Sequence, residues 1–179
     1  MAIIRPDWAN SSVAMQDYYD HYWGFPVHDD RFLFEMLSLE AFQAGLSWTT
    51  IWQRRAAFER AFHDFQIAVV AEFDDRDRAR LLDDSGIIRN RRKIEATINN
   101  ARMIQKLAAA GQSFDDYVWQ FVDYQPQRLI LKSGEPLPAQ TSLSRQMARQ
   151  MKKDGLAFVG PTTVYSFMTA VGLDRKSVV

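Results

Sequence analysis

One segment of this chain reads Leu39-Glu40-Ala41-Phe42-Gln43-Ala44-Gly45-Leu46-Ser47-Trp48. A single carboxylate, Glu40, lies in an otherwise apolar helical stretch that stops at Gly45 and is followed by Trp48. An unpaired carboxylate costs several kcal/mol to bury, so this position requires a partner or a task. The residues leave two interpretations open. Either Glu40 forms a buried structural salt bridge, or it faces a small aromatic pocket that takes a flat, cationic or amine-bearing ring.

The pattern on both sides of this segment predicts an all-helical fold. Apolar residues recur at spacings of three and four, and no long alternating run indicates a sheet. Residues 124–141 hold Pro126, Gly134, Pro136 and Pro138, and we expect an irregular connection there that packs on the domain. Capping residues, glycines and prolines set the bounds of the expected helices, which are 29–44, 48–62, 67–72, 75–84, 91–109, 114–122, 142–153 and 161–170.

Length and composition limit the class of protein. A chain of 179 residues with 47% hydrophobic residues fits one domain with a proper core. Basic and acidic residues balance at 22 each, which argues against bulk electrostatic capture of nucleic acid. The absence of cysteine excludes disulfides and thiolate metal sites and fits a reducing cytoplasm. No apolar run approaches the ~20 residues of a membrane span, so we expect a cytoplasmic protein without a membrane partner.

A second informative stretch reads Leu81-Leu82-Asp83-Asp84-Ser85-Gly86-Ile87-Ile88-Arg89-Asn90-Arg91-Arg92-Lys93-Ile94. It predicts a helix, a tight turn at Gly86 and the start of a long helix. Free backbone amides at a helix start attract anions, and four basic residues cluster there, Arg89, Arg91, Arg92 and Lys93. Such contacts position a protein on DNA without reading its sequence. The alternative is a helix–turn–helix corner with a solvated basic face.

A further basic stretch falls on the expected helix 142–153. It consists of Arg145, Arg149, Lys152 and Lys153. Charged residues on one side of a helix are commonly a solvated face. That is the interpretation we prefer for these four residues.

Four segments together resemble the DNA-3-methyladenine glycosylase I family of helix-hairpin-helix DNA glycosylases. They occur in family order and in one register from about Arg5 onward, and they cover residues 18–24, 33–48, 85–89 and 158–168. The resemblance implies one all-α, two-lobed domain over residues 1–179, with the helix-hairpin-helix at about 78–102. It also implies a base-flipping enzyme that hydrolytically excises 3-methyladenine from alkylated double-stranded DNA. Free 3-methyladenine is then the product, and no strand cleavage follows.

The resemblance also assigns roles to residues. Glu40 matches the carboxylate that recognises the base, and Tyr18 matches a pocket residue that acts with it. Trp48 matches the stacking residue, with Trp23 and Trp8 as further aromatics of the pocket, and Met15 stands where the family often has a tyrosine. Gly45 and Leu46 match the wedge that fills the gap left by the flipped nucleotide. The hairpin residues expected to bind DNA are Gly86, Ile88, Arg89, Arg91 and the additional cation Arg92.

The chemistry of this lesion suits these residues. 3-Methyladenine in DNA is cationic, so its glycosidic bond is already weakened and no strong general acid is needed. Flipping costs a few kcal/mol, least for damaged bases, and stacking on an aromatic ring returns roughly 1–3 kcal/mol per base. Glu40 can accept a hydrogen bond from the exocyclic amine and favours the cationic base over neutral adenine.

The sequence departs from the family at a zinc site. The family typically joins its terminal segments through two cysteines and two histidines, whose matching positions here are Pro6, Tyr19, Ser177 and a position after Val179. We expect a zinc-free monomer without cofactors, its termini joined by packing of Trp8, Tyr19 and the last helix. Two alternatives stay open: a non-catalytic relative that binds alkylated bases, and a glycosylase whose lesion range is shifted by Met15.

Overall fold

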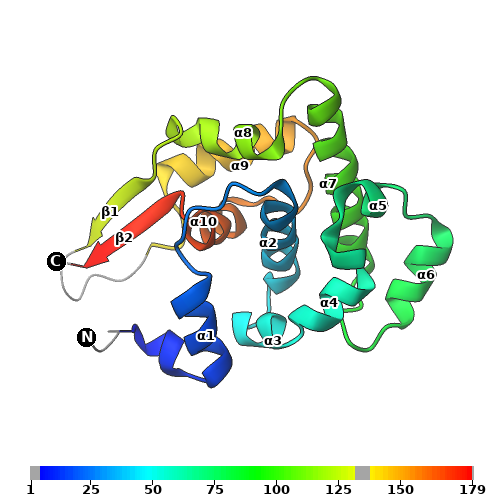
Figure 1. Ribbon diagram of the computed structural model, residues 1–179, viewed down its shortest axis with the longest axis horizontal. Coiled ribbons are helices and arrows are strands. Elements are labelled where there is room, and N and C mark those ends of the chain that lie inside the picture. The colour runs from blue at the N-terminus through cyan, green and yellow to red at the C-terminus, as the bar shows by residue number, and fades with distance from the viewer. Residues whose placement is uncertain (1–4, 132–137, 179) are drawn as a thin grey trace.

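Helix α2 (Asp30–Gln43) runs through the middle of the molecule in the computed structural model, which describes residues 5–131 and 138–178 (Figure 1). The side chain of Asp29 begins the helix by accepting a hydrogen bond from the Phe32 amide. Every residue from Leu33 to Phe42 is buried. A helix that is buried all round must be covered by other elements on every side, so α2 is the axis of the core.

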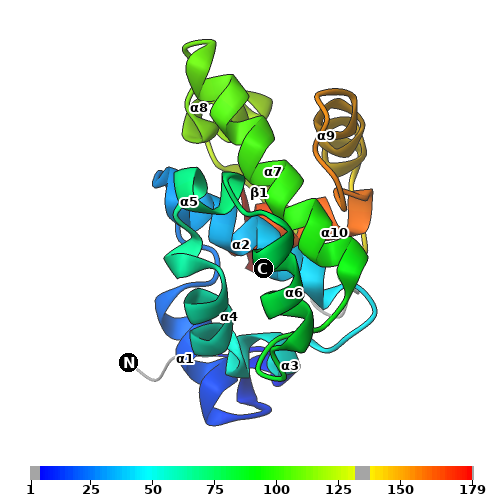
Figure 2. The same cartoon turned by 90° about the vertical axis from the view of Figure 1, so that its right-hand side faces the viewer.

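The other elements surround α2. Helices α4 to α7 lie on one side of it and α1 with the β-strands on the other (Figure 1), while α8 and α9 lie on opposite sides of α7 (Figure 2). The remaining helices are η1 (Asp7–Asn10), α1 (Val13–His21), α3 (Trp48–Gln53), α4 (Arg55–Ala61), η2 (His63–Phe65), α5 (Ile67–Ala71), α6 (Asp75–Asp83), α7 (Arg91–Ala109), α8 (Phe114–Trp119), η3 (Gln120–Val122), α9 (Ser142–Lys153) and α10 (Pro161–Ala170).

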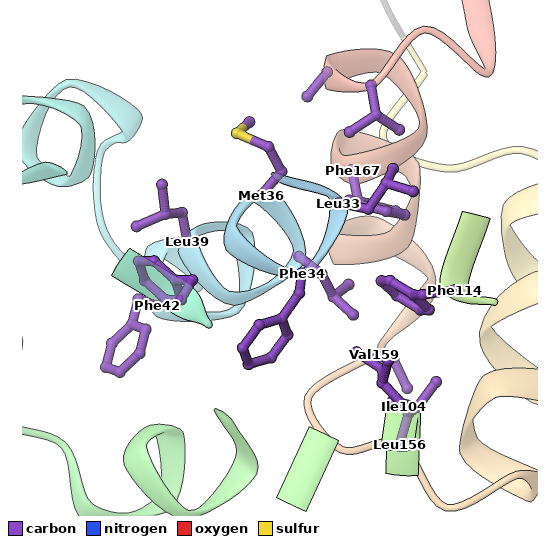
Figure 3. Packing of buried hydrophobic residues seen from close by; sticks show 14 of the residues in the cluster. Leu33, Phe34, Met36, Leu39, Phe42, Ile104, Phe114, Leu156, Val159 and Phe167 are labelled. Atoms are coloured by element: carbon purple, nitrogen blue, oxygen red, sulfur yellow. The ribbon is translucent and has the colours of Figure 1, made fainter. Parts of the chain in front are cut away.

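One hydrophobic cluster joins the two sides of α2. It contains buried residues from α1 and α2 through to α10, with no break between the two sides. Figure 3 shows Leu33 of α2 near Phe167 of α10 and Phe114 of α8, and Phe34 and Phe42 pointing to the opposite side. The expected all-α class is therefore confirmed, and the helices on both sides of α2 share a single core.

Two short strands modify the expectation of a purely helical chain. β1 (Gln127–Leu131) and β2 (Asp174–Val178) pair in parallel, with Gln127 opposite Asp174. β1 lies inside the stretch 124–141, so the expected irregular connection is wrong at that point, and residues 132–137 of it lie outside the described residues. Five-residue strands are too short to show alternation, and these two meet only because the fold brings distant segments together.

The single helix expected over 48–62 is also wrong, because it is divided at Arg54. This residue leaves the helical conformation between α3 and α4, with φ −96° and ψ 5°. Its guanidinium donates to the carbonyl of Ser85, 3.1 Å away, in the turn between α6 and α7. No glycine or proline marks the break, so the local sequence does not predict it.

A buried lysine connects α7 to the end of α2. Lys93 is 6% exposed, and its Nζ donates to the carbonyl oxygens of Phe42 and Ala44, each at 2.7 Å. Carbonyls at a helix C-terminus lack partners within the helix and carry partial negative charge, so a cation there is favourable. Lys93 is thus a structural residue, and its expected place in the exposed basic cluster is wrong.

We predict that Lys93→Met lowers the free energy of unfolding by about 2 kcal/mol, because a side chain of similar length leaves the two carbonyls without their charged donor. Urea denaturation at pH 7 measures the difference. The matched control is Lys106→Met, an exposed lysine later on the same helix, which we expect to change stability little. Equal stability of the Lys93 variant and the parent would contradict the assigned bond.

Candidate active site

A cavity of about 210 Å³ lies beside the C-terminal half of α2. It is lined by side chains from η1, α1, α2, α3 and α10 and from the segment after α1, namely Trp8, Tyr18, Trp23, Glu40, Gln43, Trp48, Ser166 and Thr169. The structure therefore brings together five of the residues predicted for base binding. Met15 is not among the lining residues, because its side chain is 2% exposed and packs in the core.

Glu40 is the buried acid of this cavity. It is 4% exposed, and burial raises its pKa to about 8. Within the described part of the chain it forms no ion pair. The salt-bridge interpretation instead applies to the other acid of α2, Glu35, whose carboxylate lies 2.6 Å from Arg55 Nε and 3.0 Å from Arg31 Nη1. One helix thus carries two buried carboxylates, of which only Glu35 is neutralised by arginine.

Aromatic rings form most of the remaining wall. The ring centroids of Tyr18 and Trp48 lie 5.2 Å apart, and those of Trp8 and Trp23 lie 5.6 Å apart. Burial and the neighbouring Glu40 raise the pKa of Tyr18 well above its ordinary value. Its hydroxyl therefore stays protonated at neutral pH and can act as a hydrogen-bond donor.

Trp48 brings an unused donor to the same wall. Its indole Nε1 is buried and meets no hydrogen-bond acceptor among the residues that the structure describes. A buried polar group without a partner costs about 1–3 kcal/mol. A carboxylate without an arginine and an indole N–H without an acceptor therefore lie in one cavity. Polar groups that lack protein partners in a small apolar cavity are typical of a ligand site.

A tight turn, which we name the rim turn, lies between Gln43 and Trp48, two residues that line the cavity. Gly45 has φ +82°, a conformation that side chains rarely adopt, and the following Leu46 is 39% exposed. Gln43, which lines the cavity, donates from Nε2 to the Leu46 carbonyl at 2.6 Å. The predicted wedge residues Gly45 and Leu46 are thus held by a side chain of the cavity.

Three lining residues are absent from the predicted set. Gln43 follows Glu40 by three residues, and this spacing places both on one helix face. Ser166 and Thr169 of α10 show the same spacing, and the Thr169 hydroxyl donates to the Ser166 carbonyl at 2.9 Å. The spacing from Glu40 could have identified Gln43. Only the packing of α10 against α2 identifies the other two.

The predicted hairpin consists of α6, a turn over residues 84–90 and α7. The Gly86 amide donates to Asp84 Oδ1 at 2.8 Å, and Asn90 caps α7 by accepting from the Lys93 amide at 3.1 Å. The side chains of Arg89, Arg91 and Arg92 are exposed. The amides of Ile88 and Arg89 meet no protein acceptor in the described residues, so they remain available to an anion.

The structure describes three of the positions that the resemblance assigns to zinc. Pro6 precedes η1, and the ring of Tyr19 stacks on Trp23 with centroids 5.5 Å apart. Neither residue offers a thiolate or an imidazole, so they do not fit zinc. Ser177 lies in β2. Across residues 5–131 and 138–178, no group of three or more His, Cys, Asp or Glu side chains could hold a metal ion.

We predict that Glu40→Gln stabilises the free protein at neutral to alkaline pH. The folded pKa of about 8 lies above the ordinary value of 4.5, so between these values the folded state holds a proton that the unfolded state has lost. Stability of the parent therefore falls as pH rises through this window, by up to about 1.4 kcal/mol per pH unit. Thermal unfolding from pH 5 to 8 should show a slope that is smaller in the variant. Parallel curves would contradict an uncompensated Glu40.

Comparison with known proteins identifies the family. The model of the methyladenine glycosylase family matches residues 8–178. The DNA-3-methyladenine glycosylase 1 of Escherichia coli K12 is 42% identical over 175 residues, which are 98% of this chain and 94% of that protein.

Among the described residues, none of the helices combines the length and the apolar character that a membrane span requires.

Solved structures agree with the family match. A crystal structure of a 3-methyladenine DNA glycosylase I superposes with a TM-score of 0.91 at 44% identity and covers 96% of this chain and 94% of its own. The Staphylococcus aureus enzyme, solved to explain its recognition of 3-methyladenine, gives a TM-score of 0.87 at 35% identity, with 92% and 87% covered. The chain therefore belongs to the methyladenine glycosylase family.

Proposed function

We propose that this chain flips 3-methyladenine out of alkylated double-stranded DNA and hydrolyses its glycosidic bond. Membership of the family makes the chain a glycosylase for methylated adenine. The observation that carries the proposal is Glu40, a buried acid without an arginine in a cavity walled by aromatic rings. Such an environment favours a ligand that is flat, positively charged and able to donate a hydrogen bond.

Glu40 selects the lesion by charge. In the empty cavity, burial disfavours the carboxylate, as the raised pKa shows. A cationic base supplies the missing positive charge and so favours ionised Glu40, whereas neutral adenine does not. The carboxylate also accepts a hydrogen bond from the exocyclic amine. Burial makes ionised Glu40 unfavourable in the free protein, and only a positively charged base compensates for it. Glu40 thus discriminates damaged from normal bases.

The aromatic residues hold the flipped base. Trp48 stacks on it, Tyr18 donates its hydroxyl at the ring edge, and Trp8 and Trp23 close the remaining wall. Met15 does not line the cavity and packs in the core. Met15 would therefore affect base binding only through the side chains that pack against it. Any effect of Met15 on the range of lesions would be indirect in the same way.

Hydrolysis without a covalent intermediate suits the lining of the cavity. The cationic base is a good leaving group, so a water molecule can attack the sugar carbon as the base departs. Covalent catalysis by a glycosylase with lyase activity requires an amine nucleophile. Among the described residues no lysine lines the cavity, and Lys93 is bound to the carbonyls of α2. These observations support a monofunctional enzyme.

The hairpin and the rim turn provide the contacts to DNA. The Ile88 and Arg89 amides and the side chains of Arg89, Arg91 and Arg92 suit backbone phosphates around Gly86. Leu46, exposed beside Gly45 at the rim of the cavity, suits the space that the flipped nucleotide leaves. Lys93 joins these two parts, because it bridges the first turn of α7 and the carbonyls before Gly45. We infer that the protein binds DNA and excises the base as a monomer.

The first test is release of free 3-methyladenine from methylated duplex DNA. We expect release by the parent and a loss of at least about a hundredfold in Glu40→Gln, because the variant cannot supply negative charge to the cationic base. The parent rate should rise with pH from 6 toward 8 as Glu40 ionises.

Two outcomes would redirect this proposal. Parent protein that binds methylated DNA but releases no base would favour the non-catalytic relative. Faster release of bulkier N3-alkylpurines than of 3-methyladenine would favour the shifted lesion range. Glu40→Gln that retains full activity would contradict the assigned role of the carboxylate.

We propose further that the terminal segments are joined without zinc. Arg5 Nε donates to Asp20 Oδ1 at 2.8 Å, and the rings of Trp8 and Tyr19 meet edge to face with centroids 5.6 Å apart. The backbone amides of Gly24 and Val27, which follow α1, donate to the carbonyls of Ala170 and Val171 at the end of α10, at 3.0 and 3.1 Å. The side-chain contacts hold the N-terminal segment on α1, and these backbone bonds connect the chain after α1 to the C-terminal part without a metal clip.

We predict that a chelator leaves the unfolding temperature unchanged and that the purified protein holds far less than one equivalent of zinc. Plasma mass spectrometry measures the metal, and thermal unfolding with and without EDTA measures its effect. Removing a structural zinc would instead unfold the segments that it joins. About one equivalent of zinc, lost together with stability on chelation, would disprove this proposal.

A further inference from the structure

A second and larger hollow lies on the molecule away from the base cavity. It measures about 940 Å³ and runs between α7 and α9 to the start of α10. Figure 2 shows α7 and α9 as two separate helices, with α10 near their lower ends. We name this hollow the α7–α9 groove. Five cations line it, Arg91 and Arg92 from α7 and Arg145, Arg149 and Lys152 from α9.

The charge of the α7–α9 groove is not balanced by neighbouring acids. Within the described residues, none of the five cations forms an ion pair with a carboxylate. The one acid of the groove, Glu95, is bound 2.8 Å from Arg78 Nε outside it. Some arginines outside the groove are paired, as Arg55 is with Glu35 and Arg80 with Asp77. The groove therefore brings five cations without a paired acid together on one surface of a chain with zero net charge.

The floor of the α7–α9 groove is open and mostly apolar. Small residues, including Ala96, Ala148 and Gly160, form part of it, and a side chain added at Gly160 would meet nothing within 4 Å. The guanidinium of Arg92 lies over the ring of Phe158, 5.8 Å from its centroid. The N-terminus of α10, which has no side-chain cap, also opens here. An apolar floor accommodates deoxyribose, while cations and free amides reach phosphates.

We propose that the α7–α9 groove binds the backbone of duplex DNA that flanks the lesion, beyond the part held by the hairpin. This rests on the proposed function, because it assumes DNA as the partner. Arg91 and Arg92 belong to both surfaces, so the groove continues directly from the hairpin. Arg145 and Lys152 are seven residues apart on α9, about 10 Å, which matches about three base-pair steps. Under this proposal α9 presents a binding face, where the sequence alone favours a solvated one.

The test compares binding to two methylated duplexes over a range of salt concentrations. One extends about 4 base pairs on each side of the lesion and the other about 12. The variant Arg145→Gln/Arg149→Gln/Lys152→Gln leaves the hairpin and the base cavity intact. We expect it to reduce the dependence of log K on log salt by about 2–3 on the long duplex, because each lost phosphate contact removes about 0.9. Binding to the short duplex should change little.

Two control variants distinguish DNA contacts in the groove from a general effect of the protein's positive charge. The variant Arg76→Gln/Lys106→Gln/Lys153→Gln removes three exposed cations that do not line the groove, and it should bind the long duplex like the parent. The variant Arg145→Lys/Arg149→Lys keeps the positive charge, so its dependence of log K on log salt should equal that of the parent. Equal slopes for the parent and the groove variant, or equal losses in the groove and control variants, would overturn the proposal.

The same experiment keeps this proposal distinct from the proposed function. Release of 3-methyladenine from the short duplex tests the cavity and should be equal in the parent and the groove variant. Absence of release by the parent would contradict the proposed function and leave the salt dependence on the long duplex as a separate result.

Discussion

The bond between Lys93 and the end of α2 is the constraint on which the arrangement of the functional parts depends. A buried ammonium needs oxygen partners, and the free carbonyls of Phe42 and Ala44 need a donor. Meeting both needs fixes the first turn of the hairpin helix against the last turn of the helix that carries Glu40. The hairpin, the rim turn at Gly45 and the cavity are therefore connected through this side chain, in addition to the core that they share.

The two buried acids of α2 show how environment assigns function. Glu35 is neutralised by Arg31 and Arg55 and serves stability. Glu40 is buried without such a partner, which raises its pKa and destabilises the folded state near neutral pH. In the proposed function, a cationic ring that enters the cavity offsets this cost. Under that proposal, a group that is unfavourable in the free protein gives the selectivity for a damaged base.

The distribution of charge carries information that its total conceals. Equal numbers of basic and acidic residues give a net charge of zero, yet most ion pairs lie away from the hairpin and the α7–α9 groove. Five cations without a paired acid lie together on the surface that continues from the hairpin turn. DNA contact by such a surface depends on local charge density and is screened by salt. The chain can therefore remain electrically balanced as a whole and still bind a polyanion.

The sequence by itself determined most of the helices and their caps, because these depend on local signals. Periodicity and capping residues predict α6, α7, α9 and α10 almost to the residue. An acid in an apolar helix before Gly45 and Trp48 indicates a small aromatic pocket, and the resemblance to the family adds Tyr18, Trp8 and Trp23. Only the tertiary structure decided the break at Arg54, the pairing of β1 with β2, the burial of Lys93 and the place of Ser166 and Thr169 in the cavity. Each of these depends on a partner far along the chain, and no spacing of neighbouring residues encodes such a contact.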